Sequence, residues 1–499
     1  MTIRKQNNSN TQQALWLVVG QICTFAITFL TAPILARYFD KTEYGTYRQI
    51  LYVYTCVQSL FTMGLPQVFA YFLPRVGMGQ QKMLVRKVTM LLFLIGSIFS
   101  LLLYAFAEVI AGLLKNPELA VGLRIFSVFP MFTLPTMGVE GIYTTIRRTK
   151  EIAIYQIVSK LFMFLCIVLP VVIWDTGYRE AVIGWGVASF LTFLMAMYMK
   201  NEPYRCVQSE KIPNIYREIF GYSLPLTGAF IAGSFIHFSD SFFVSRYYGT
   251  QVFAELSNGY FSIPIVAIVM GSVKSVLAPQ FSGAQARGNM KPVVESYRNA
   301  LKKTSLVILP MLMFCFFFAP DIMVALFGTQ YEVSGSYFRV YIVRDFMLIF
   351  PYYMVLMALG HSKFYMRMFV TWAVTAWIVD YAIVSFGGSP LCITAASSLF
   401  NILAIIVGQV FIRKKCGITL IPKNIVVHVL KILSHCLVLL LLLYSARLYV
   451  FSGMNVFVSI IMFGLVFYVL LIVTGRFVKV DYITIVENIP LFRRWKKKH

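Results

Sequence analysis

Long apolar stretches alternate with short polar connections along almost the whole chain. About fourteen stretches have roughly 20 or more residues each, enough for a helix to cross a hydrocarbon core of about 30 Å. The polar connections are too short to bury a core of their own. This pattern predicts an all-α polytopic membrane protein whose function depends on side chains inside the helix bundle. The expected spans are 14–36, 46–73, 88–114, 119–146, 153–173, 180–200, 219–247, 252–278, 301–326, 336–360, 364–386, 390–411, 425–450 and 454–475.

Positive charge is concentrated on alternate connections. The chain has 44 Lys and Arg against 20 Asp and Glu, a formal net charge of +24. Most of the cations, Lys200 among them, share one face if the N-terminus is cytoplasmic, and the positive-inside rule then places both termini in the cytoplasm. Because topology accounts for the basic charge, we expect no nucleic-acid partner. The eight cysteines show neither a disulfide framework nor metal-ligand spacing, so no metal site is expected.

The chain contains an internal repeat. Ala36-Arg37-Tyr38-Phe39 follows the first span and Ser245-Arg246-Tyr247-Tyr248 follows the seventh, and Arg37 and Arg246 are 209 residues apart. Met63-Gly64 and Met270-Gly271 match at nearly the same offset. Two parallel six-helix units of this kind are one of the transporter symmetries. We therefore predict an N-terminal bundle at 1–217, a C-terminal bundle at 218–415, and two extra helices with a basic tail at 416–499.

Polar side chains form stripes inside three of the spans. In the first span they recur at steps of three and four, so they share one helix face. Such a stripe either lines a water-filled lumen or supplies hydrogen bonds between packed helices. The three stripes together favour a lumen. The candidate lining residues are Gln21, Thr24, Thr28, Thr31, Tyr52, Thr55, Ser59 and Ser234.

Several ionisable side chains lie deep in the predicted spans, where an unpaired charge costs several kcal/mol. Cations in a lumen would bind phosphate or pyrophosphate, and acidic groups or a histidine would carry protons or bind Na⁺. Glu140 and Lys160 could instead form an ion pair, and Lys274 could reach the headgroups. Arg344 and Asp345 point about 100° apart on a helix, so we expect that they do not simply neutralise each other. The candidates for anion binding are Arg344, Lys274, Lys160 and Arg48, and those for ion coupling are Asp240, His237, Glu140 and Asp345.

The run APILARYFDKTEYGTYRQ, which ends the first span and leads into the second, resembles polysaccharide exporters of the MOP superfamily. These are the Wzx-type flippases of lipopolysaccharide O-antigen and capsule synthesis, related to MATE and lipid II flippases. The resemblance implies a V-shaped pair of six-helix bundles in the bacterial inner membrane. It also implies that undecaprenyl-pyrophosphate-linked oligosaccharide moves to the periplasmic leaflet by alternating access, with H⁺ or Na⁺ antiport. Candidate partners are this lipid-linked oligosaccharide, membrane lipids, a polysaccharide polymerase and a chain-length regulator.

Two other functions stay open at this stage. One is a multidrug or lipid II exporter on the same fold, although a cation-drug exporter would favour an acidic lumen. The other is a membrane enzyme such as a glycan polymerase or an acyltransferase. Such enzymes usually need a large external loop or an intramembrane histidine with partner groups. The spans leave no room for a long external loop, and His237 is the only deep histidine candidate, so we expect a transporter with no catalytic residues.

Overall fold

The computed structural model describes residues 10–62, 64–212, 215–451 and 453–482, without the side chains of 10, 11, 13, 14 and 286 and most of those between 222 and 237. Every regular element in these residues is a helix. The chain divides into two compact units, Met1–Ala254 and Glu255–His499. The predicted fold class is confirmed: the protein is an all-α, multi-pass membrane protein. The predicted limits at 217 and 415 stay a prediction.

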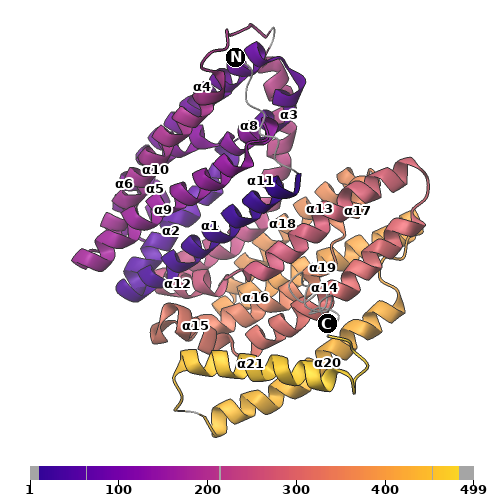
Figure 1. Cartoon of the computed structure of the whole chain (residues 1–499). Coiled ribbons are helices and arrows are strands. Elements are labelled where there is room, and N and C mark those ends of the chain that lie inside the picture. The colour runs from indigo at the N-terminus through magenta and orange to yellow at the C-terminus, as the bar shows by residue number, and fades with distance from the viewer. Residues whose placement is uncertain (1–9, 63, 213–214, 452, 483–499) are drawn as a thin grey trace, which may run out of the picture. The chain divides into compact units, whose positions relative to one another are not determined.

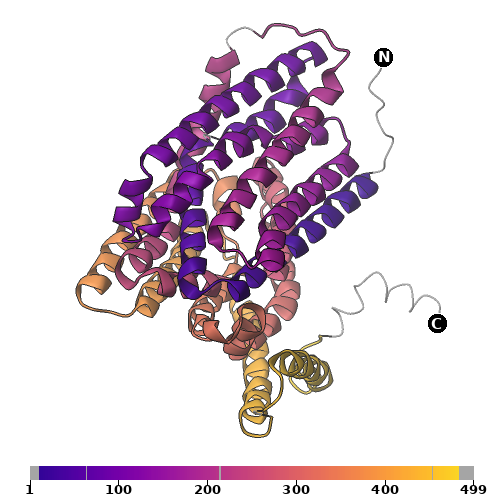
Figure 2. The same ribbon diagram turned by 90° about the vertical axis from the view of Figure 1, so that its left-hand side faces the viewer.

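The N-terminal unit is a set of helices that run alongside one another (Figures 1 and 2). In it α9 packs against both α1 and α10, and α10 also packs against α6 and α7. The helices are α1 (Asn10–Tyr38), α2 (Lys41–Phe61), α3 (Leu65–Phe72), η1 (Leu73–Arg75), α4 (Met78–Ala105), α5 (Ala107–Leu113), α6 (Glu118–Phe126), α7 (Val128–Thr133), η2 (Leu134–Thr136), α8 (Val139–Thr145), α9 (Thr149–Trp174), α10 (Tyr178–Asn201), η3 (Glu202–Tyr204), α11 (Ile215–Tyr248) and the start of α12 (Thr250–Gly259).

The C-terminal unit holds the remaining helices. In it α14 packs against α20, and α19 packs against α16 and α18. The helices are α13 (Pro264–Ala286), α14 (Lys291–Phe317), α15 (Ala319–Phe327), η4 (Thr329–Tyr331), α16 (Ser334–Leu348), α17 (Tyr353–Ala358), α18 (Ser362–Ser385), α19 (Pro390–Cys416), α20 (Lys423–Tyr449) and α21 (Val456–Gly475).

Several predicted spans are broken helices, and this changes the span count. In the described residues 11 helices are long and apolar enough to cross a membrane, or up to 12 if α2 and α3 form one span. The predicted span 252–278 is divided between α12 and α13, with Pro264 at the start of α13. The predicted span 336–360 is divided between α16 and α17, on either side of Pro351. Proline lacks a backbone N–H and interrupts the helical ladder, so the count of fourteen is not confirmed.

A buried lysine donates hydrogen bonds to the backbone carbonyl groups at a helix break in the fourth span. This span runs through α6, α7, η2 and α8, and Gly138, which precedes α8, has a φ of +90°. The Lys200 ammonium donates hydrogen bonds to the carbonyl oxygens of Pro135 at 2.7 Å and Met137 at 2.6 Å. The sequence analysis counted Lys200, the last residue of the predicted span 180–200, among the cations of the cytoplasmic face. The structure shows that its side chain is 2% exposed inside the unit, and the sidedness stays a prediction. A helix break in an apolar environment leaves carbonyls that need a donor, and this lysine supplies it.

A second buried polar network joins α2, the segment after α5, and α11. The Gln49 amide donates to Ser245 Oγ at 2.7 Å, and its carbonyl oxygen accepts from the Asn116 amide at 2.6 Å. Asn116 also donates to Thr46 Oγ1. All four side chains are buried. The network therefore fixes the start of α2 against the end of α11.

The starts of α2 and α12 agree with the internal repeat. These helices begin at Lys41 and Thr250, which have the same 209-residue separation as Arg37 and Arg246. The Gln251 amide donates to Thr42 Oγ1 at 3.1 Å, and these two residues are also 209 apart. The arrangement of the two predicted copies about a common axis stays a prediction.

Candidate functional site

A cavity of about 150 Å³ lies among the membrane helices of the C-terminal unit. One charged side chain, Lys274 of α13, lines it together with aromatic rings from the α16–α17 connection, α17 and α18. The helix break at Pro351 places Tyr352 and Tyr353 in the cavity wall. The lining residues are Lys274, Leu348, Phe350, Pro351, Tyr352, Tyr353, Tyr365, Phe369, Asn401, Ala404 and Ile405.

The Lys274 ammonium is half-buried and lies 5.4 Å from the centre of the Tyr353 ring. This is within the range of a cation–π interaction, which lowers the cost of holding a charge away from bulk water. Within the described residues the ammonium has neither a hydrogen-bond acceptor nor an ion-pair partner. Its three N–H groups are therefore available to an anion that enters the cavity.

The aromatic rings form one connected group. The Tyr365 ring centre lies 6.2 Å from that of Tyr352, 6.4 Å from that of Tyr353 and 4.5 Å from that of Phe369. The Asn401 amide nitrogen donates to Ser397 O at 2.9 Å, and its carbonyl oxygen can accept a further hydrogen bond. Aromatic faces, one amide oxygen and one ammonium can together bind a polar ring that carries a phosphate.

Arg344 and Asp345 of α16 contradict the expectation that they do not neutralise each other. The Arg344 Nη2 atom lies 2.9 Å from Asp345 Oδ1, and the guanidinium carbon lies 3.7 Å from the Tyr341 ring centre. The directions of neighbouring Cβ atoms do not limit a long arginine side chain, which bends back over its own helix. Arg344 is thus a paired cation one helical turn from Leu348 of the cavity wall.

The candidate site residues of the N-terminal unit each have different interaction partners. Glu140 accepts a hydrogen bond from Gln156 Nε2 at 2.6 Å, and the Lys160 ammonium lies 3.9 Å from Met163 Sδ. The described residues therefore show no Glu140–Lys160 ion pair. Arg48 is half-buried on α2 and Asp240 is 2% exposed on α11, and both have interaction partners.

The polar stripes are satisfied mostly within their own helices. The described hydroxyls bond to carbonyl oxygens three or four residues earlier, so they do not join neighbouring helices. Tyr52 differs, because its hydroxyl donates to Phe238 O of α11 at 3.0 Å. Gln21 is exposed, and the side chains of Ser234 and His237 lie outside the described residues. The members with bonds inside their own helix are Thr24, Thr28, Thr31, Thr55 and Ser59.

The sequence analysis missed the aromatic wall around Lys274. Its signal was present, since Pro351 is followed at once by two tyrosines inside an apolar stretch. Tyr365 and Asn401 come from other helices, and no spacing in the sequence connects them with Lys274. The helix break and the packing of α13, α18 and α19 bring these residues together.

Comparison with known proteins identifies the family. Residues 34–335 match the family model described as polysaccharide biosynthesis protein. The chain belongs to this family. The chain is similar to the succinoglycan biosynthesis transport protein ExoT of Rhizobium meliloti (strain 1021), to which it is 26% identical over 336 residues. That match covers 65% of this chain and 64% of the relative.

Solved structures show that this polysaccharide biosynthesis protein has the fold of MOP superfamily transporters. The lipid II flippase MurJ, in an inward closed conformation, has a TM-score of 0.69 at 15% identity, over 93% of this chain and 99% of that chain. A MOP superfamily transporter from Pyrococcus furiosus has a TM-score of 0.58 at 12% identity, over 82% and 95%. An outward-facing MATE transporter gives 0.55 at 13% identity, over 82% and 95%. The predicted MOP/MATE-like fold is confirmed.

Proposed function

We propose that this protein is a flippase that moves undecaprenyl-pyrophosphate-linked oligosaccharide between the leaflets of a bacterial inner membrane. The family description, the transport function in the name of ExoT and the flippase fold support this proposal. A lipid-linked saccharide has a pyrophosphate between an apolar tail and a polar glycan. Its transporter therefore needs anion and sugar contacts at membrane depth, while the tail stays in lipid.

The observation that carries the proposal is the Lys274 cavity. An ammonium without an acceptor, surrounded by tyrosine rings, provides one contact for phosphate and several for the flat faces of sugar rings. In alternating access the cavity opens to one leaflet and then to the other. Net movement of the substrate requires that its affinity for the cavity differs between these two states of the protein. In this scheme Arg344, already paired with Asp345, changes its partner when a pyrophosphate approaches.

Ion coupling and orientation complete the proposal. Asp240 is a buried carboxylate on a membrane helix, and its burial suits an H⁺ or Na⁺ carrier. The loop charges favour cytoplasmic termini. An enzymatic role receives no support from the comparisons, because the relatives are a transport protein, a flippase and a transporter. In the described residues, no group of three or more His, Cys, Asp or Glu could hold a catalytic metal ion.

The test is leaflet-to-leaflet movement of a defined prenyl-pyrophosphate glycan in proteoliposomes. Lys274→Gln should lower the initial rate at low substrate by roughly tenfold to a hundredfold, because a charge-assisted contact contributes about 1.5–3 kcal/mol. Lys303→Gln is the matched control, since Lys303 is an exposed cation of α14 outside the cavity. Equal rates for Lys274→Gln and Lys303→Gln, at equal incorporation, would contradict the proposed site.

A comparison of two substrates, a lipid-linked glycan and a cationic drug, distinguishes the flippase from a multidrug exporter. Glycan on a prenyl pyrophosphate should move, and a cationic drug should not. Transport of the drug with no movement of the lipid-linked glycan would establish the multidrug alternative. Covalent change of the glycan by the purified protein would establish the enzyme alternative.

A further inference from the structure

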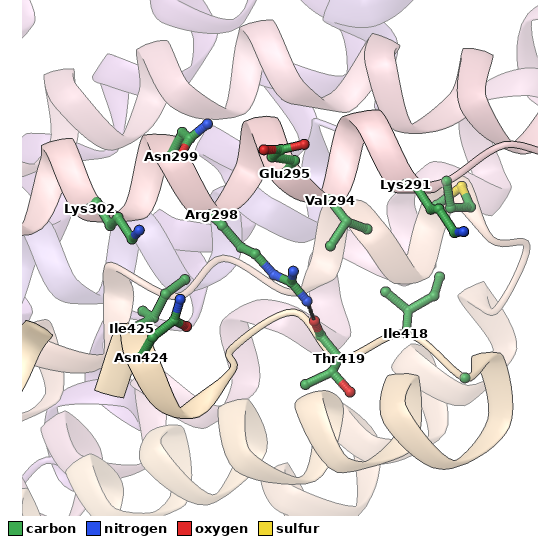
Figure 3. Close-up of a pocket in the computed structure, with 12 residues that line it drawn as sticks. Lys291, Val294, Glu295, Arg298, Asn299, Lys302, Ile418, Thr419, Asn424 and Ile425 are labelled. Atoms are coloured by element: carbon green, nitrogen blue, oxygen red, sulfur yellow. Dashed lines mark hydrogen bonds between the residues drawn. The ribbon is translucent and has the colours of Figure 1, made fainter. Parts of the chain in front are cut away.

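A larger cavity, of about 570 Å³, lies at the start of α14 beside the connection between α19 and α20 (Figure 3). It belongs entirely to the C-terminal unit and is separate from the Lys274 cavity. Thr419 and Ile418 come from the connection, and Asn424 comes from the first turn of α20. The wall is thus built from polar side chains, backbone and the ends of two long helices.

Three cations face this cavity from one side of α14. Lys291, Arg298 and Lys302 are separated by seven and four residues, so they follow one helix face over roughly 16 Å. The wall also contains one carboxylate, Glu295, and no cation of this wall forms an ion pair with it or with another described residue. The cavity therefore has a clear excess of positive charge.

Arg298 supplies a donor that lacks a partner. One end of its guanidinium donates to Thr419 O, as the dashed line in Figure 3 shows. Its Nε is buried and has no acceptor among the described residues. A buried N–H without a partner is unfavourable, and an anionic oxygen bound here would accept its hydrogen bond. The buried, unpartnered Nε therefore favours a specific anion-binding site over a merely basic stretch of protein surface.

We propose that this cavity binds the phosphate of an anionic membrane phospholipid. The apolar surface beside it favours a lipid over a free anion. Immediately after Asn424, α20 exposes Val426, Val427 and Leu430 at 44%, 40% and 55%. Acyl chains can cover this surface while the phosphate lies among the cations of α14. Basic pockets between membrane helices on the cytoplasmic side bind lipid headgroups in this way, and the loop charges favour a cytoplasmic position for this end of α14.

The site does not depend on which substrate is transported. It predicts a lipid that stays bound when the purified full-length protein is in detergent. Native mass spectrometry with added phosphatidylglycerol measures this binding directly. Phosphatidylcholine serves as the uncharged lipid, and inorganic phosphate serves as the soluble anion.

Lys291→Gln and Lys302→Gln are the primary variants, because their ammonium groups donate no hydrogen bond to another described residue, so that the substitutions remove no structural contact there. Each should weaken phosphatidylglycerol binding about fivefold, and the pair about 25-fold, from roughly 1 kcal/mol for each cation near a headgroup. Lys303→Gln, the neighbouring exposed cation outside the cavity, should leave binding unchanged. Arg298→Gln should weaken it further but also removes the contact with Thr419.

Selective loss of phosphatidylglycerol in the Lys291 and Lys302 variants would support the lipid site. Equal loss in Lys303→Gln would show a non-specific charge effect and overturn the proposal. Unchanged binding in the double variant would overturn it as well. Displacement of the lipid by inorganic phosphate at comparable concentration would show that the site takes a free anion, and the proposal of a lipid would then be wrong.

Discussion

Replacing Lys200 by methionine should destabilise the N-terminal unit by about 2–4 kcal/mol. The ammonium is the donor for Pro135 O and Met137 O, and it also lies 3.2 Å from Thr89 Oγ1 and 4.7 Å from the Phe69 ring centre. Loss of the donor leaves two buried carbonyls at a cost of about 1–3 kcal/mol each. The lost cation–π contact adds to this cost. Methionine recovers part of the total, because a charge no longer has to be buried.

The assay is equilibrium unfolding of the purified protein in mixed micelles with increasing denaturing detergent. Lys211→Met is the matched control, because Lys211 is an exposed cation of the same unit, and its change should stay within about 0.5 kcal/mol. A second measurement is proteolysis, which should become faster near residues 135–138 only in Lys200→Met. If both variants unfold with the same free energy and the cleavage pattern is unchanged, Lys200 does not stabilise the helix break.

Three further predictions follow from buried polar groups and backbone geometry. Gln49→Leu should lower the unfolding free energy by about 2–4 kcal/mol, because Asn116 and Ser245 lose their partner; an unchanged value in the same assay would refute this role. Gly138→Ala should cost about 1–3 kcal/mol, since its φ is +90° and an added Cβ would clash with the Phe69 ring; Phe69→Leu should restore only part of the loss, because the backbone strain remains. Asp240→Asn should abolish the dependence of transport on a pH or Na⁺ gradient in proteoliposomes, and retained dependence would exclude this carboxylate from the ion path.

Hydropathy and loop charge predict most of the membrane helices, because apolar length and cation asymmetry are properties of short, continuous segments. The helix breaks are harder to predict. The apolar stretch 336–360 is predicted as one span, but the structure has two helices, α16 and α17, on either side of Pro351. Mean hydropathy over a window does not detect this break, because the residues on both sides of the proline are apolar. The position of Pro351 is visible in the sequence, but the cavity beside the helix break cannot be predicted from it, because the cavity wall includes residues of other helices.

Lys200 and the Arg344–Asp345 pair show why the depth of a charge, estimated from the sequence, does not predict its contacts. Lys200 lies at the end of an apolar stretch and looked like a loop cation, but the carbonyls of a distant helix break bind it inside the unit. Arg344 and Asp345 looked divergent because only their Cβ directions were considered, whereas the flexible arginine reaches its neighbour. Both outcomes depend on where a long side chain ends.

Lys200 and Lys274 are the same residue type in membrane helices, and the contacts of the ammonium separate their roles. At Lys200 the donors already have acceptors from the protein itself, namely two carbonyl oxygens and a hydroxyl, so little is left to bind a ligand. At Lys274 the described residues offer a ring face and open volume, but no acceptor. Because a buried charge is costly without partners, the contacts of Lys200 stabilise the fold. We propose that Lys274 gains its missing acceptor when an anionic substrate binds, and this is why the proposed function assigns substrate binding to Lys274 and structural support to Lys200.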